Sequence, residues 1–163
     1  MVFAYYNRLN QTQKRIYRES DKVTVIKLPE TGRLKPLITE LEAVLQQEHR
    51  RRTEDISQRL VTGMAQGLDL PPVRIKVLAR RPHGNWGELH GLYETAEGRT
   101  PAHITVWMRT AQRKRVVAFK TYLRTVLHEF CHHLDYTLLK LPDSFHTEGF
   151  YKRESSLFHQ LTG

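Results

Sequence analysis

The sequence predicts a single α+β domain in which several helices surround a small sheet. Apolar residues at helical spacing dominate both ends of the 163-residue chain, whereas residues 73–108 alternate or form short extended runs. A composition of 39% hydrophobic and 26% charged residues is ordinary for one globular domain. No repeat or low-complexity tract divides the chain, so we expect a helical region, residues 1–70, to pack on a core formed by residues 71–163.

The N-terminal residues predict one helix followed by an extended stretch. Residues 3–20 carry scattered apolar residues at helical spacing among polar and basic ones. Residues 24–28 form a short extended run. Pro29, Gly32 and Pro36 then predict a loop or hinge.

A second, longer helix is expected over residues 34–66, because its apolar positions keep helical spacing at both ends. Residues 49–55 are polar all round, so this stretch must lie in solvent or bend. Gly67 and the pair Pro71-Pro72 are typical of a helix end.

Three strands are expected next. Residues 73–78 alternate apolar and polar side chains, and residues 87–94 and 102–108 form two further extended runs. Residues 82–85 and 96–99 read as turns, so the three strands should form an antiparallel sheet.

Pro101 opens the third expected strand, and a proline at that position suits an edge strand because it donates no backbone hydrogen bond. An edge strand beside the candidate site described next would matter for function. Its free N–H and C=O groups could pair with an extended peptide substrate.

Residues 114–140 predict one long helix without an internal Gly or Pro, and it contains the pattern His128-Glu129-Phe130-Cys131-His132. Histidines four residues apart lie on one face of a helix, so both imidazoles can bind one zinc ion. Glu129 would sit beside that metal, where its carboxylate can accept a proton from an attacking water. These features are typical of metal-assisted hydrolysis.

A catalytic zinc site usually has three protein ligands. His146 is the preferred third ligand, because Pro142 breaks the chain after the motif helix and lets it return; a last helix is expected over residues 147–161. Glu148, Glu154 and Cys131 are alternatives, although Cys131 is better explained as a small core residue. His133 should point away from His128.

Several residues are candidates for supporting roles. Asp135 could orient a histidine ligand or remain a surface carboxylate. Stabilising the oxyanion needs a donor opposite Glu129, and the candidates are Tyr136, Tyr151, His90 and Arg153.

The net charge of +9 favours anionic partners, and three basic clusters contribute to it: residues 50–52, residues 80–81, and residues 109–115, which include Arg113, Lys114 and Arg115. Solvated surface charge is the alternative explanation. The single cysteine excludes an intramolecular disulfide, no apolar run reaches the length of a membrane span, and no signal peptide is evident. A cytoplasmic protein is therefore expected.

Four segments of the chain resemble a known family. They are Gly91-Leu92-Tyr93, Ile104-Thr105-Val106, Thr125-Val126-Leu127-His128-Glu129-Phe130-Cys131-His132 and His146-Thr147-Glu148-Gly149-Phe150. With these segments, residues 73–160 resemble the SprT-like zincin metallopeptidases, the group that includes the Spartan proteases. The resemblance implies a zincin-like fold, zinc on His128, His132 and His146, Glu129 as general base, and possible recruitment to DNA. The chain lacks the cysteines of the C-terminal zinc ribbon found in some of these proteins, and residues 1–70 show no match.

The leading hypothesis from the sequence is a zinc metallopeptidase acting on a protein or peptide. A nucleic-acid-associated binding or adaptor protein with a structural zincin site is an alternative. A zinc hydrolase of a non-peptide amide is another.

Overall fold

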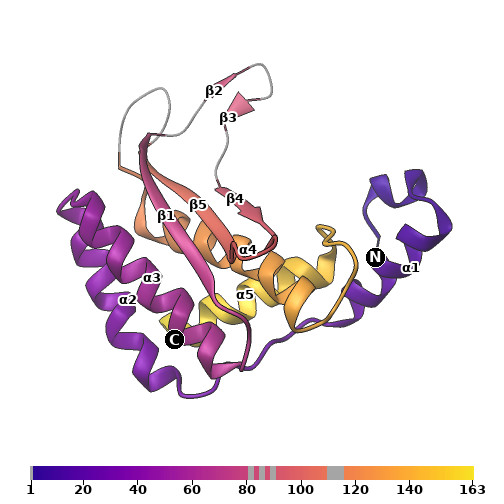
Figure 1. Cartoon of the computed structure of the whole chain (residues 1–163), viewed down its shortest axis with the longest axis horizontal. Coiled ribbons are helices and arrows are strands. Elements are labelled where there is room, and N and C mark those ends of the chain that lie inside the picture. Colours follow the sequence, from indigo (N-terminus) through magenta and orange to yellow (C-terminus); the bar gives the residue numbers. More distant parts are fainter. Residues whose placement is uncertain (1, 81–82, 85–86, 89–90, 110–115) are drawn as a thin grey trace.

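The computed structural model describes residues 2–80, 83–84, 87–88, 91–109 and 116–163. Within these residues the protein is a mixed α/β structure, with helices packed against a small sheet (Figure 1). The elements in chain order are η1 (Ala4–Arg8), α1 (Gln11–Lys22), α2 (Thr31–Gln46), α3 (Arg50–Gly67), β1 (Val73–Arg80), β2 (His83–Gly84), β3 (Gly87–Glu88), β4 (Gly91–Glu94), β5 (Ala102–Arg109), α4 (Phe119–Thr137) and α5 (Glu148–Thr162).

The main sheet has the strand order β1-β5-β4, and it is mixed. β5 pairs with β1 in parallel and with β4 in antiparallel fashion. The predicted three-stranded antiparallel sheet is therefore wrong, because β5 inserts between its two predecessors. Pro101 precedes a central strand, so the predicted edge position is wrong as well. Its missing N–H is harmless because Pro101 lies just outside the ladder that begins at Ala102.

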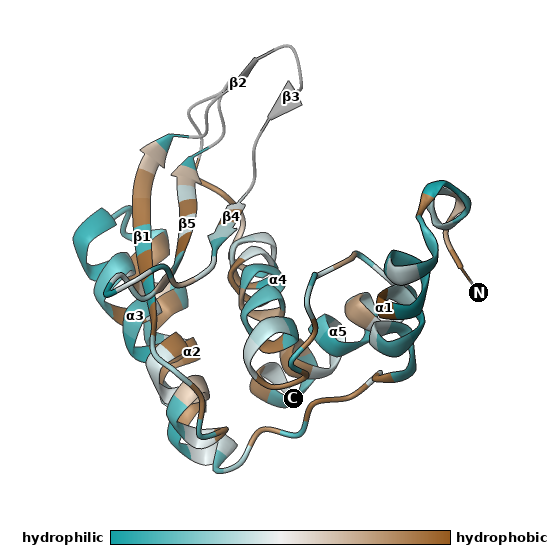
Figure 2. Cartoon of the chain, turned by 45° about the vertical axis from the view of Figure 1, so that its right-hand side comes forward, coloured by the Kyte–Doolittle hydropathy of each residue, from teal (hydrophilic) through white to brown (hydrophobic). Residues whose placement is uncertain are grey.

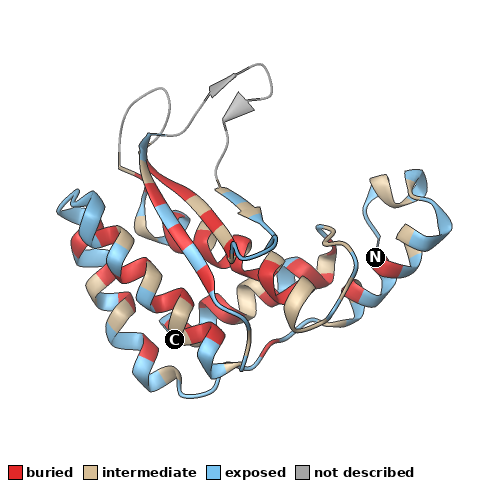
Figure 3. Ribbon diagram, in the orientation of Figure 1, coloured by how far each residue is buried: buried red, intermediate tan, exposed pale blue. Residues whose placement is uncertain are grey.

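One face of the sheet is buried and the other is open. Val73, Ile75 and Val77 are buried and lie in register with buried residues of β5, while Arg74 and Lys76 between them are exposed (Figure 3). Figure 2 shows hydrophobic residues running along β1 and β5 side by side. The alternation seen in the sequence thus distinguishes the core face from the solvent face.

The helices cover the buried face. α3 packs against β1, α4 packs against β4 and β5, and α5 packs against α4, α2 and α1. A single hydrophobic core cluster takes residues from both predicted regions, from Ile26 to Leu161. The helix that carries the histidine motif is therefore held between the sheet and α5.

The predicted helix over residues 34–66 is two helices. α2 ends at Gln46 and α3 begins at Arg50, with Glu48 in the left-handed region at φ 57°. Gly32 and Pro36 lie inside α2 rather than in a loop. Pro36 is close to the helix start and removes one backbone hydrogen bond, while buried residues of α2 hold the helix on the core.

The boundaries of other elements also differ from expectation. Residues 24–28 form no strand, and the first predicted helix is a short 3-10 helix followed by α1, which begins at an Asn10 capping box. α4 begins at Phe119, because residues 116–117 still belong to the sheet end, where the Val117 N–H donates to the Met108 carbonyl. β2 and β3 form a small hairpin. Residues 83–84 fall in the predicted turn over residues 82–85, while β3 and β4 both fall in the predicted strand over residues 87–94. The described helices include none long and apolar enough to cross a membrane.

Candidate metal centre

Three histidines converge at the C-terminal half of α4 and the loop that follows it. The Nε2 atom of His146 lies 3.2 Å from Nε2 of His128 and 3.1 Å from Nε2 of His132. Lone pairs that face one another at such distances repel unless a proton or a cation lies between them. Two nitrogens bound tetrahedrally to one zinc ion, each at about 2.0–2.1 Å, would lie about 3.3–3.4 Å apart. Two of the three separations are close to that spacing, and the ligand nitrogens of all three histidines lie within 4.8 Å of one another, so within the described residues they form a group that could hold a metal ion.

Partners on the far side of two rings select the correct tautomer. The Ser144 hydroxyl donates to Asp135 at 2.7 Å, so its oxygen is left to accept the Nδ1 proton of His132, also at 2.7 Å. Glu154 lies 2.8 Å from Nδ1 of His128 and accepts its proton. With the proton on Nδ1, each ring presents an Nε2 lone pair to the cluster.

The surroundings also keep the ligand rings neutral. Burial, and then the neighbouring His128 and His146, lower the pKa of His132 to about 3. Burial lowers the pKa of His146 as well, followed by the influence of His128. Neutral imidazole is the form that binds metal, so both histidines are ready to bind at neutral pH.

Phe150 packs against the rings of all three histidines. Its fully buried ring lies 4.9, 4.8 and 5.2 Å, centroid to centroid, from the rings of His128, His132 and His146. Because α5 starts with Thr147 as its N-cap, the chain turns at once from the ligand His146 into the helix that carries Phe150. The turn thus fixes the third histidine relative to the other two.

Glu129 lies beside the histidines and is almost fully buried, with 6% of its surface exposed. Burial raises the pKa of Glu129 to about 7, the charge of His128 opposes this shift, and Glu154 adds to it. The side chain packs against β4: a Cβ placed on Gly91 would lie 3.0 Å from Glu129 Cγ and from Oε2. A carboxyl group with a pKa near neutrality can both accept and return a proton.

The metal cluster and Glu129 open into a cleft of about 630 Å³. Strand β4 forms one wall, and the described residues place β5 on one side of β4 and no strand on the other. The edge strand beside the metal helix is thus β4, not the predicted residues 102–108. The residues lining the cleft are Gly91, Leu92, Tyr93, Glu94, Thr95, Glu97, His128, Glu129, His132, Tyr136, Ser144 and His146.

A second, mostly apolar pocket of about 480 Å³ adjoins this cleft and shares Tyr93, Thr95 and Tyr136 with it. The rings of Tyr93 and Tyr136 stack 6.1 Å apart between the two spaces. Pro71 and Pro72, which precede β1, and residues of the β4–β5 turn such as Pro101 complete the pocket. The cleft therefore has an apolar extension next to the metal centre.

The remaining predicted site residues lie in different surroundings. Asp135 is fully buried and reaches His132 through Ser144, and Tyr136 lines the cleft. Tyr151 is 42% exposed, with its ring 5.8 Å from that of His146. Burial raises the pKa of both tyrosines, so their hydroxyls remain donors at neutral pH. His90 lies outside the described residues.

The alternatives for the third ligand are located elsewhere. Glu154 contacts His128 on the Nδ1 side, away from the cluster, and Glu148 pairs with Lys152. Cys131 is fully buried in the core, where burial raises its pKa. The ring of His133 points to the other side of α4: its Nδ1 lies 2.8 Å from the Tyr93 hydroxyl, and its Nε2 lies 2.9 Å from the Pro71 carbonyl oxygen.

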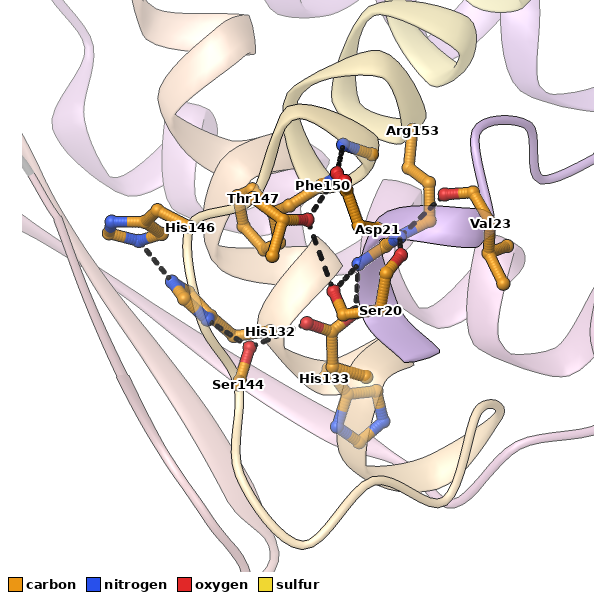
Figure 4. A network of polar contacts seen from close by, with 12 residues as sticks. Ser20, Asp21, Val23, His132, His133, Ser144, His146, Thr147, Phe150 and Arg153 are labelled. Carbon is orange, nitrogen blue, oxygen red and sulfur yellow. Dashed lines mark hydrogen bonds and ion pairs between the residues drawn. The ribbon is translucent and has the colours of Figure 1, made fainter. Parts of the chain in front are cut away.

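The site also contains residues whose roles the sequence did not indicate. Ser144 orients His132, Glu154 orients His128, and the Tyr5 hydroxyl donates to the His146 carbonyl at 2.6 Å. Arg153 was considered only as an oxyanion donor, but it is fully buried and pairs with Asp135 (Figure 4). All of these contacts join separate elements, so no local spacing signals them. The one sequence feature that hinted at these contacts is a serine, Ser144, shortly after the motif helix.

Comparisons of the chain with protein families, with curated proteins and with solved structures find no match.

Proposed function

We propose that this protein is a zinc-dependent metallopeptidase whose ligands are His128, His132 and His146. The observation that carries the proposal is the convergence of three Nε2 atoms beside a buried glutamate in an open cleft. Three neutral nitrogens leave a fourth position for water or substrate, as a catalytic zinc site requires. The resemblance of the motif segments to SprT-like zincins supports the same activity.

Glu129 is the general base in this proposal. Zinc at such a site supplies Lewis acidity, which lowers the pKa of a coordinated water to about 7 and polarises a carbonyl group. The carboxylate of Glu129 takes a proton from the attacking water and returns it to the leaving amine. Its pKa of about 7, raised mainly by burial, suits both transfers. Tyr136, which lines the same cleft, is our candidate donor to the oxyanion.

A peptide is the substrate class that the cleft favours. β4 offers an unpaired strand edge along the metal centre, and an extended peptide can add to such an edge through backbone hydrogen bonds. The adjoining apolar pocket then accepts a hydrophobic side chain of the bound peptide. Backbone pairing would supply affinity and the pocket would supply selectivity.

The Glu129→Gln variant tests this proposal. Glutamine keeps the size of the side chain but cannot accept the proton, so peptidase activity should fall on the order of 10²–10⁴-fold. Zinc content, measured by elemental analysis, should stay at one ion per chain in both proteins. The activity assay uses a quenched fluorescent peptide library.

Two further measurements sharpen the result. His146→Ala should lose the zinc, whereas His159→Ala, on the far end of α5, should keep it. Full peptidase activity in a clean Glu129→Gln preparation would rule out the assigned base. Activity confined to small non-peptide amides would identify a zinc hydrolase of another substrate class.

A second candidate function, nucleic-acid binding, is favoured by the placement of basic residues. Arg80 and Arg109 are register partners at the end of the sheet, and the Arg50 guanidinium donates to the Val77 carbonyl, three residues before Arg80 in β1. One residue from each of the three basic clusters thus lies near this part of the sheet. Arg113, Lys114 and Arg115 lie outside the described residues.

A further inference from the structure

A chain of hydrogen bonds joins helix α1 to the metal ligand His132 (Figure 4). One terminal nitrogen of Arg153 donates to the carbonyls of Ser20 and Val23, each at 2.6 Å. The other donates to Asp135 at 2.9 Å, and both side chains of this ion pair are 0% exposed. Asp135 accepts the Ser144 hydroxyl, and Ser144 contacts Nδ1 of His132.

Each bond in this chain has a fixed direction. Arginine can only donate, and an ionised carboxylate can only accept, so Arg153 and Ser144 both donate to Asp135. Having given its one proton to Asp135, the Ser144 hydroxyl can only accept from His132. The proton of the imidazole is thereby held on Nδ1, and Nε2 is left free.

We propose that Asp135, acting through Ser144, is a positioning residue that fixes the zinc-binding tautomer of His132, and that Arg153 ties this control to helix α1. The proposal rests on the metal centre proposed above. It assigns a role to the N-terminal segment, for which the family resemblance offers none. Consistent with that role, Tyr5 of the same segment holds the His146 carbonyl, and Asp21 accepts the Gly149 N–H at 2.9 Å.

The geometry of the buried arginine supports a positioning role. Burial raises the pKa of Asp135, and the Arg153 guanidinium and the Ser144 hydroxyl oppose that shift. Arg153 approaches from α5, Asp135 from α4, and the two carbonyls from the end of α1. Three helices therefore meet at the Arg153 guanidinium, which fixes the orientation of the Asp135 carboxylate relative to His132.

Asp135→Asn provides the direct test. The asparagine oxygen accepts from Arg153, so its NH₂ group faces Ser144 and donates to it. The Ser144 hydroxyl then donates to Nδ1 of His132, which moves the imidazole proton to Nε2, where it opposes the metal. We expect zinc affinity, measured by competition with a chromophoric chelator, to fall roughly 10–100-fold.

Ser144→Ala is the second variant, and it leaves the buried ion pair intact. It removes the acceptor of the Nδ1 proton, and we expect a loss in zinc affinity of about tenfold. Ser155→Ala, a similarly half-buried serine on α5, should bind zinc like the wild type. In the metal-free protein, ¹⁵N chemical shifts should show His132 protonated on Nδ1 in the wild type and on Nε2 in Asp135→Asn.

The double variant separates positioning from a general structural effect. If Asp135 acts through Ser144, adding Asp135→Asn to Ser144→Ala should cost no further zinc affinity. Losses that add independently, or wild-type affinity in Ser144→Ala, would overturn the proposal while leaving the metal centre in place. A wild-type protein that binds no zinc would overturn both.

Discussion

Among single residues, Gly91 determines how much room there is for Glu129, the general base of the proposed mechanism. A Cβ at this position would lie 3.0 Å from Glu129 Cγ, from Glu129 Oε2 and from Thr125 Cγ2. Contacts this short force a neighbour to move by a few tenths of an ångström. Strand β4 can therefore run along the metal helix only because its first residue has no side chain.

The Gly91→Ala variant should displace Glu129 without touching the histidines. Small misplacements of a catalytic group are costly, so we expect kcat/KM for a peptide substrate to fall roughly tenfold. Zinc affinity should stay within about twofold of the wild type. Gly32→Ala is the matched control, because a Cβ at Gly32 meets nothing within 4 Å. A fall in zinc affinity as large as the fall in activity would contradict this explanation.

Some residues of the candidate site can be recognised from their spacing in the sequence, and others only from the folded structure. His128, Glu129 and His132 follow from spacing on one helix, and Asp135 was placed near a ligand by the same geometry. Ser144 and Glu154 contact the rings only after α5 has folded back on α4. Such contacts depend on three-dimensional packing, which no short window of sequence contains.

At the scale of elements, the least predictable features are helix ends without glycine. Glu48 and Asp69 adopt positive φ, at 57° and 56°, directly after the C-caps of α2 and α3, and Lys140 does so at 55°, two residues after the C-cap of α4. Because Glu48 is not a residue typical of a helix end, the sequence predicts one helix over residues 34–66, with residues 49–55 in solvent or bent, where the structure has a break between α2 and α3. The ends of α2 and α3 are instead determined by how the two helices pack on the core.

Lys140→Gly should stabilise the protein. Lys140 is exposed and left-handed at the end of the α4 region, a conformation that costs an ordinary residue roughly 1 kcal/mol relative to glycine. After the greater freedom of glycine in the unfolded chain is allowed for, a gain of about 0.5 kcal/mol in the free energy of unfolding is expected. Urea denaturation measures it.

The control for this substitution is Lys120→Gly, an exposed lysine in the first turn of α4. Lys120 has a helical backbone, where glycine is less favourable than lysine, so this change should lower the free energy of unfolding by up to about 1 kcal/mol. Equal destabilisation by the two substitutions would show that Lys140 carries no strain.

The sheet shows why strand positions were easier to predict than strand pairing. The run at residues 73–78 and the run at residues 102–108 match β1 and β5 closely. Their parallel pairing joins residues far apart in sequence, such as Val73 with Ala102, and the β2–β3 hairpin and β4 lie between them in the chain. Alternation shows which face of a strand is buried but not which strand lies beside it.

In the molecule as a whole, the basic residues at the end of the sheet and the candidate metal centre lie in different places. The basic end of the sheet includes Arg80 and Arg109, and neither residue lines the cleft that contains the histidine cluster. Binding and hydrolysis can then be tested by separate variants.

Replacing Arg51 and Arg52 with glutamine should weaken binding to duplex DNA. Both are exposed at the start of α3, beside the basic end. The slope of log K against log salt should become shallower by up to about 2, since each lost phosphate contact contributes about 0.9. Fluorescence anisotropy over a salt series provides the measurement.

Arg15→Gln with Lys27→Gln is the control of equal charge, on exposed residues of the N-terminal region. Its slope should match that of the wild type. An equal change of the slope in both double variants would mean that DNA binding depends on the net charge of the protein rather than on this surface.

The contacts of the metal centre have a consequence for protein synthesis. The histidine pair on α4 emerges from the ribosome well before Arg153 and Glu154, the α5 residues on which its geometry depends. The hydrogen bond from Tyr5, far away in the sequence, likewise forms only once His146 has been synthesised. A growing polypeptide therefore carries the motif without its supports, and the centre is completed only after α5 has been made and packed. If the centre is the peptidase site proposed above, such timing would keep an unfinished chain inactive toward neighbouring nascent chains.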